Sequence, residues 1–307
     1  MALAPVALFV YNRVDNTRQT LQALSQNTLA SETEVYVFSD GGRDKSSWKA
    51  VEQVREVIRS TQMAAAFKRL ILIERLENFY LERNITEGIA QVLKDHDRII
   101  VLEDDIVTSP YYLQYMNEAL DLYQNVPRVM HVAGFTNLAL DDTPFYFTPH
   151  MSGWGWGTWR DRWQKHFKHY TTREEALEGL TAEDWNAIQY NEAFPCLKSL
   201  DRKPIPWDIC WEIAIYRAKG LCLTPGRTMV RNIGLSSGTH FRSWRLLQHF
   251  EFDREPQQQA LSLSYIENPH KNPDIEALFA QAIRDWGIRY TPLGKVVRYL
   301  YKKVCAS

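Results

Sequence analysis

Short apolar runs alternate with amphipathic stretches along the first 135 residues of the chain. Each run has the length of a strand and is almost continuously hydrophobic, which is typical of strands that are covered on both faces. The runs are Val6 to Tyr11 (VALFVY), Glu34 to Ser39 (EVYVFS), Arg69 to Glu74 (RLILIE) and Arg98 to Glu103 (RIIVLE). The stretches between them predict helices near residues 16–26, 47–62 and 81–94. Strands that alternate with helices predict an α/β fold with flanking helices on a mostly parallel central sheet.

The pattern is less regular after this point. Ser109 followed by Pro110 fits an N-cap with proline at the first helical position, so we expect a helix from there to about Tyr123. The remaining expectations are a strand at 128–132, a glycine-rich loop or bend at 153–159, a polar helix within 168–200, a helix opened by 204–208, and a loop at 232–240. We find no convincing linker. We therefore divide one domain into a nucleotide-sugar-binding half (1–135) and an acceptor-binding half (136–250), followed by a helical tail (251–307).

Polar residues follow the predicted strands at the point where each strand ends. The first strand runs into Arg13, the second into Asp40 and two glycines, and the fourth into Glu103-Asp104-Asp105. Parallel sheets bind their ligands beyond the carboxyl ends of the strands. We therefore expect these side chains to meet at one edge of the sheet.

Three adjacent carboxylates repel one another and raise each other's pKa unless a cation is present. Mg²⁺ and Mn²⁺ prefer oxygen ligands and are commonly held by one or two carboxylates together with phosphate oxygens. Glu103, Asp104 and Asp105 therefore indicate a metal site that would neutralise a departing phosphate. The alternative is a solvated acidic loop before a helix. The position of the cluster after a buried strand favours the metal site.

A second pair of acids is spaced for one face of a helix. Asp208 and Glu212 lie four residues apart in WDICWE, so their side chains point the same way on a helix. Asp208 near the helix N-terminus could accept a proton from a hydroxyl group, and the alternative is a capping role. Further along, the loop that ends at His240 could cover bound phosphates with its backbone N–H groups, although a histidine near glycines is more often incidental.

Composition excludes several classes of protein. The 36 Lys and Arg residues balance 37 Asp and Glu residues, so no bulk field attracts nucleic acid. The four cysteines show no metal-binding spacing, and no apolar stretch approaches the roughly 18 to 20 residues that span a bilayer. With no signal peptide, we expect a cytoplasmic protein. The tail from Tyr290 to Val304 could form a basic amphipathic helix at a membrane surface, or it could pack on the domain.

Ten tryptophans are more than a core of this size requires. Several lie close together, among them Trp154, Trp156, Trp159 and Trp207. Aromatic rings can form an apolar wall for sugar C–H groups while the indole N–H donates to hydroxyls. The alternative is a large aromatic core.

The motifs, taken in order, resemble the glycosyltransferase A fold. The resemblance is greater to the N-acetylglucosaminyltransferase I type branch, which has E-D-D where many relatives have D-x-D, and it extends to bacterial family 2-like glycosyltransferases. It runs, with gaps, from Val6 to about Phe241. The matching pieces are YNR (11–13), SDGG (39–42), EDD (103–105), GWGW (153–156), WD (207–208) with Trp211, PGRTM (225–229) and GTHF (238–241).

The resemblance implies a role for each matching residue. Arg13, Asp40 and, more loosely, Asn84 would contact the nucleotide, with Asp40 at the uracil edge. Asp105 would be the direct metal ligand, while Asp104 and Glu103 address the ribose or the donor sugar. Asp208 would be the catalytic base, with Glu212 as the alternative. His240 would lie in the loop that closes over the donor, as a further metal ligand or hydrogen-bond donor. Apart from the resemblance, the aromatic-wall interpretation assigns Trp154, Trp156 and Trp207 to the acceptor.

The leading hypothesis is an inverting glycosyltransferase that uses Mn²⁺ or Mg²⁺ and a nucleotide-diphosphate sugar, expected to be a UDP-sugar. By analogy with soluble bacterial enzymes, its acceptor would be a glycan or lipid-linked glycan in bacterial surface-polysaccharide synthesis. One alternative is a catalytically degenerate, glycan-binding protein of the same fold. A sugar nucleotidyltransferase is the other, but residues 11–20 contain no glycine for the phosphate loop that such an enzyme needs.

Overall fold

The computed structural model describes residues 2–60, 65–189, 199–234 and 255–289. Its first half contains β1 (Val6–Val10), α1 (Val14–Ser25), η1 (Ala30–Glu32), β2 (Glu34–Ser39), α2 (Lys45–Arg59), β3 (Arg69–Glu74), α4 (Tyr80–Val92), β4 (Arg98–Glu103), β5 (Ile106–Thr108), α5 (Tyr112–Leu122) and β6 (Val129–Ala133). The second half contains β7 (Phe145–Thr148), β8 (Trp156–Trp159), α6 (Arg160–His166), α7 (Arg173–Leu177), α8 (Ala182–Ile188), α9 (Trp207–Arg217), β9 (Leu221–Pro225), β10 (Val230–Asn232) and α10 (Pro273–Arg289). The predicted α/β class is confirmed.

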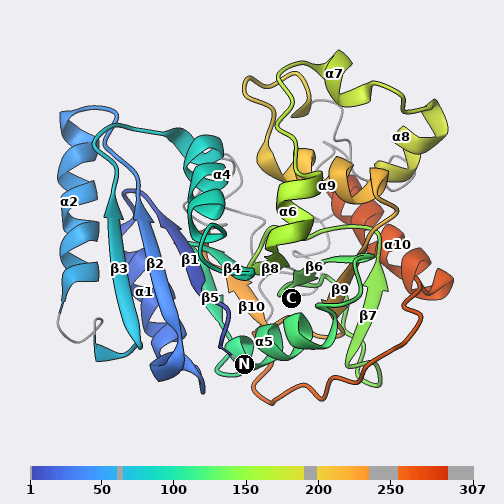
Figure 1. Ribbon diagram of the computed structural model, residues 1–307, viewed down its shortest axis with the longest axis horizontal. Coiled ribbons are helices and arrows are strands. Elements are labelled where there is room, and N and C mark those ends of the chain that lie inside the picture. Colours follow the sequence, from blue (N-terminus) through green and yellow to red (C-terminus); the bar gives the residue numbers. More distant parts are fainter. Residues whose placement is uncertain (1, 61–64, 190–198, 235–254, 290–307) are drawn as a thin grey trace, which may run out of the picture.

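One eight-stranded sheet forms the centre of the molecule, in the order β3-β2-β1-β4-β8-β6-β9-β7 (Figure 1). Strands β1 to β4, β6 and β9 run in one direction, whereas β8 and β7 run in the opposite direction. The sheet is therefore mixed and mostly parallel. Strands from both sides of residue 135 share it, and a small second sheet pairs β10 with β5.

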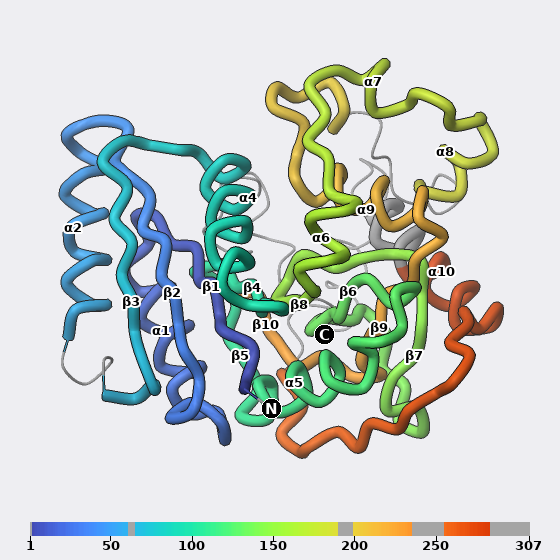
Figure 2. Tube along the Cα trace, viewed as in Figure 1, coloured from blue at the N-terminus to red at the C-terminus, as the bar shows by residue number. Residues whose placement is uncertain are grey.

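Helices cover both faces of the sheet, as the tube view shows (Figure 2). Alternate residues of β1 enter two different hydrophobic clusters: Val6 and Leu8 pack with residues of α1, α2 and α5, whereas Ala7 and Phe9 pack with residues of α4, α6 and α9. All five residues of β1 are buried. The run is continuously apolar because both faces of the strand are buried, as the sequence predicted.

The predicted strands at 34–39, 69–74 and 98–103 have the observed bounds, but three later expectations are wrong. The stretch 153–159 is not wholly a loop, because Trp156–Trp159 forms β8 between β4 and β6. Helix α5 begins at Tyr112, two residues later than predicted, because Ser109 Oγ accepts the Tyr111 N–H at 3.1 Å and so caps a turn that precedes the helix. The described part of 168–200 contains the short helices α7 and α8 instead of one long helix.

Candidate active site

At the ends of β1 and β4, one basic side chain meets two acidic ones. The Arg13 guanidinium donates from Nη1 to Asp105 Oδ2 at 2.8 Å and from Nε to Asp104 Oδ2 at 3.3 Å, and its Nη2 also contacts Asp104 Oδ1. These side chains can meet because β1 and β4 are parallel neighbours, and the pairing of Phe9 with Glu103 brings the ends of the two strands to the same level. The predicted convergence of Arg13 with the acidic strand end is confirmed.

The electrostatics of this cluster follow from its burial. Burial lowers the pKa of Arg13, but the Asp104 and Asp105 carboxylates outweigh that effect and raise it above its ordinary value. Burial raises the pKa of Asp104 to about 6 despite the Arg13 charge, and it raises the pKa of Glu103 well above the ordinary value, with added repulsion from Asp105 and Asp104. The strand end therefore favours a bound cation, which would restore the ionised form of each acid.

The three acids do not form one three-ligand group. In the described part of the chain, no three His, Cys, Asp or Glu side chains come together as a metal-binding set. Asp105 still has a carboxylate that is 13% exposed and fits closely against Gly234, where an added Cβ would lie 2.0 Å from its Oδ2. This donor set fits a hard divalent ion held by one or two carboxylates and completed by phosphate oxygens.

Asp40, at the end of β2, organises the neighbouring loop. Its Oδ1 accepts hydrogen bonds from the backbone N–H of Gly41 at 2.9 Å and of Phe79 at 2.7 Å. Burial raises the pKa of Asp40, and these N–H groups oppose that rise. Close packing makes a glycine necessary at 41, since a Cβ there would lie 2.4 Å from the carbonyl of Glu77. The loop that follows β3 is thus fixed to the end of β2.

Asn84 lies behind this edge. It is buried in α4, and its side-chain oxygen accepts a hydrogen bond from Arg75 Nε at 3.2 Å. The Arg75 guanidinium in turn lies over the Phe79 ring, 4.6 Å from its centroid. Asn84 therefore supports the Asp40 loop through Arg75 in this structure.

Helix α9 carries the two acids that the sequence placed on one helical face. Asp208 lies in the first turn, half-buried, and burial raises its pKa. Glu212, one turn later, is buried and has both oxygens engaged: Oε1 contacts His150 Nδ1 at 2.6 Å and Oε2 accepts from Met151 N–H at 2.9 Å. The structure contradicts the alternative assignment of Glu212 as the base, because its carboxylate is used inside the core.

The family model of glycosyl transferase family 2 matches residues 6–194, which is more than half of the chain. The chain belongs to glycosyl transferase family 2. A family 2 glycosyltransferase moves a sugar from a nucleotide-sugar donor, which agrees with the predicted class of enzyme. No sequence among curated proteins matches it.

Two solved structures resemble this chain at low sequence identity. PcManGT, a mannosyltransferase from Pyrobaculum calidifontis in complex with GDP-Man and Mn²⁺, is 13% identical; the match covers 71% of this chain and 72% of that chain, with a TM-score of 0.38. S. aureus TarS 1-349 is 12% identical, over 76% of this chain and 61% of that chain, with a TM-score of 0.42. Neither likeness is close enough to identify a substrate of this family 2 chain.

The predicted aromatic wall of the family 2 chain is largely core. Trp156 is fully buried, with His131 stacked at a ring-centroid distance of 5.1 Å and Trp207 at 5.3 Å. Trp207 is 4% exposed and Trp159 is 3% exposed. The assignment of Trp156 and Trp207 to an acceptor surface is therefore wrong, because their rings fill the space between the sheet and α9. Trp154 is half-buried against Phe135.

One acid at this site was not predicted. Glu82, in the first turn of α4, accepts the backbone N–H of Trp207 through Oε2 at 2.5 Å and interacts with the charge of Asp208. Burial raises the pKa of Glu82 to about 7. An acidic residue in the first turn of a helix is common, so no local signal distinguished Glu82 from an ordinary helix start.

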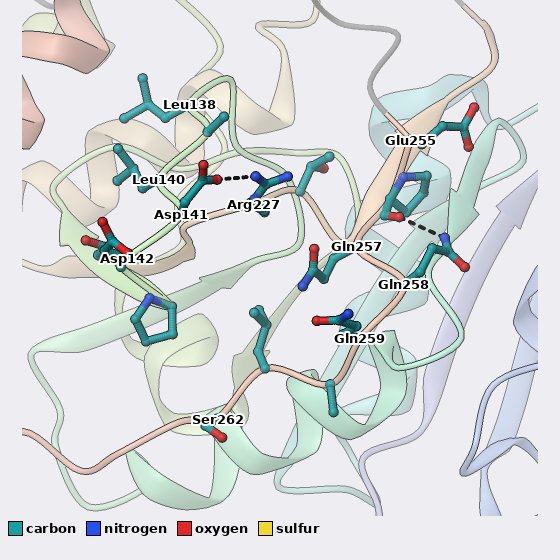
Figure 3. Close-up of a pocket in the computed structure, with 17 residues that line it drawn as sticks. Leu138, Leu140, Asp141, Asp142, Arg227, Glu255, Gln257, Gln258, Gln259 and Ser262 are labelled. Carbon is teal, nitrogen blue, oxygen red and sulfur yellow. Dashed lines mark hydrogen bonds and ion pairs between the residues drawn. The ribbon is translucent and has the colours of Figure 1, made fainter.

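The described structure also has a cavity of about 900 Å³ between residues 138–144 and 255–262. Its walls include Leu140, Gln257 and the ion pair of Asp141 with Arg227 (Figure 3). None of the predicted site residues lines it. His240 and the tail from Tyr290 to Val304 lie outside the described residues. No helix in the described part of the chain has the length and apolar character needed to cross a membrane.

Proposed function

We propose that this chain is an inverting, metal-dependent hexosyltransferase that uses a UDP-sugar and acts on a hydroxyl of a glycan or lipid-linked glycan. One observation carries the proposal: α9, with Asp208 in its first turn, packs against β1 and β4, since Trp207 shares a hydrophobic cluster with Phe9 and Val101. An in-line displacement needs a base on one side of the anomeric carbon and the departing diphosphate on the other. Asp208 and Asp105 would serve these two sides.

Asp208 acts as the base in this mechanism. It accepts the proton of the acceptor hydroxyl while that oxygen attacks the anomeric carbon. Its raised pKa, caused by burial, makes it a stronger proton acceptor than an exposed aspartate. No covalent nucleophile is required, since one displacement inverts the configuration.

Arg13 and the acidic strand end hold the donor. The Arg13 guanidinium presents several donors in a fixed plane, which suits phosphate oxygens. Asp105 and, as a second ligand, His240 would hold Mn²⁺ or Mg²⁺, which supplies Lewis-acid neutralisation of the leaving diphosphate when bound. Asp104 and Glu103 address the ribose and the donor sugar, and Asp40 recognises the uracil edge.

The acceptor would bind beside the base, at the surface that Trp154 reaches. Trp154 is the tryptophan of the predicted wall that is not fully buried, so it is our candidate for acceptor contact. A lipid-linked acceptor in bacterial surface-polysaccharide synthesis would suit a cytoplasmic enzyme whose basic tail (290–307) contacts the inner face of the membrane. Asn84, predicted to contact the nucleoside, would act on the nucleotide site through Arg75, whose Nε donates to its side-chain oxygen at 3.2 Å.

A donor screen tests the proposal. Each common nucleotide sugar is added with Mn²⁺, and thermal stabilisation and slow hydrolysis are measured. We expect a UDP-sugar to stabilise the chain and to release UDP. Absence of binding by every nucleotide sugar, with or without metal, would contradict the proposal. Binding without turnover would favour the catalytically degenerate, glycan-binding alternative.

Two variants separate the proposed roles. Asp105→Ala should lose metal-dependent donor binding, because it removes the carboxylate proposed as the direct ligand of the metal. Asp208→Asn should keep donor binding and lose turnover by roughly 10² to 10⁴. Equal loss of donor binding in both variants would mean that Asp208 has a structural role instead.

A further inference from the structure

Within the first turn of helix α9, Asp208 Oδ1 accepts the Ile209 N–H at 2.8 Å, but the N-cap residue gives the helix no side-chain cap. Its N-cap residue is Pro206, which makes no side-chain capping hydrogen bond. The first N–H groups of a helix have no partner within the helix and need one from elsewhere. Here the Trp207 N–H is accepted by Glu82 Oε2 at 2.5 Å. Glu82 belongs to α4, so the helix that carries Asp208 is capped from a different part of the chain.

Glu82 is itself connected to the donor edge of the sheet. Glu82 lies in the first turn of α4. The N-cap residue of that helix is Phe79, whose N–H donates to Asp40 Oδ1 at 2.7 Å. Tyr80, between them, has a positive φ of 58°, which residues other than glycine rarely adopt. A short series of contacts therefore runs from Asp40 at the end of β2, through the start of α4, to the start of α9.

We propose that Glu82 is a positioning residue for transfer: it fixes the first turn of α9, and with it Asp208, relative to the nucleotide edge of the sheet. This inference rests on the proposed role of Asp208 as the base. Glu82 needs no contact with the substrate to act in this way. The geometric requirement is strict, because a displacement of about 1 Å at a catalytic group can cost roughly 10²-fold in rate.

Glu82 is half-buried beside charged groups. Its pKa of about 7 results first from burial, and the Asp208 charge adds to it while the Trp207 N–H and the Arg202 charge oppose it. An oxygen remains available to accept the Trp207 N–H whether the carboxyl group is ionised or protonated.

The test measures UDP release from the UDP-sugar that stabilises the chain most, with Mn²⁺ present. Glu82→Ala removes the cap, and we expect the hydrolysis kcat to fall at least tenfold while the donor KM stays within about twofold. Glu82→Gln keeps an oxygen for the Trp207 N–H, so most of the kcat should return. Glu87→Gln, an exposed acid of α4 paired with Arg83, is the matched control and should change neither parameter.

A double-mutant cycle with Asp208→Asn separates the possible outcomes. If Glu82 acts through Asp208, Glu82→Ala should add little to the loss already caused by Asp208→Asn. If Glu82→Ala causes the same loss in the Asp208→Asn background as in the wild type, the inference is overturned. Normal hydrolysis by Glu82→Ala, together with an inactive Asp208→Asn, also overturns the inference, but the proposed function then stands. Full activity of Asp208→Asn overturns both. Should Glu82→Ala fail to fold, Glu82→Met keeps the volume of the side chain but cannot accept the Trp207 N–H, and an unchanged kcat in that variant is the overturning result.

Discussion

Glu82 should make the folded protein less stable as the pH rises from 4 to 8. Burial raises its pKa from 4.5 to about 7 in the folded chain. Because the folded state holds the proton more tightly, stability from this group is greatest below the unfolded pKa and is lost as pH rises through about 7. At about 1.4 kcal/mol per pKa unit, the loss amounts to roughly 3 kcal/mol between pH 4 and pH 8.

Glu82→Gln removes this titration while keeping the size of the side chain. Unfolding by urea, followed by circular dichroism from pH 4 to pH 8, gives the free energy of unfolding of both proteins. Other titrating groups are common to both, so they cancel in the difference. We expect the variant to gain up to about 3 kcal/mol relative to the wild type as the pH rises across this range. The reasoning is refuted if the difference stays constant with pH, or if the wild type gains on the variant. Glu87→Gln, the exposed control on α4, should differ little from the wild type throughout.

Three further predictions concern other parts of the site. Trp156→Ala should lower the free energy of unfolding by about 3 to 5 kcal/mol, measured by urea unfolding, because a fully buried ring is replaced by a cavity. Gly41→Ala should weaken UDP binding in calorimetry by displacing the Asp40 loop, whereas Gly153→Ala, whose Cβ would lie 3.5 Å from the Trp207 ring, should not. Arg13→Lys should weaken UDP binding at least tenfold, since lysine cannot pair with both Asp104 and Asp105 through one planar group; unchanged affinity would contradict its role at the diphosphate.

The fold was predictable where the hydrophobic pattern along the chain matches the burial of the element that forms there. The strands of the first half were located because burial on both faces leaves continuous apolar runs. Trp156–Trp159 was missed as a strand because its glycines read as a bend, whereas pairing with β4 and β6 decided its conformation. In this strand, local preference gave way to tertiary pairing. The start of α5 was misplaced by two residues because Ser109 caps a turn that precedes the helix.

The sequence by itself determined the chemistry available at the site. Its order of motifs placed Arg13, Asp40 and the Glu103-Asp104-Asp105 cluster at strand ends, and parallel strands must bring such ends to one edge. It also placed Asp208 in the first turn of a helix.

Tertiary structure alone decided which of these groups are free to act. Packing of α9 against the sheet buried the rings of Trp156 and Trp207, and it committed Glu212 to His150. The approach of α4 to α9 brought Glu82 to the backbone of Trp207. Burial and partnership depend on which surfaces meet in space, and no local pattern of residues specifies that.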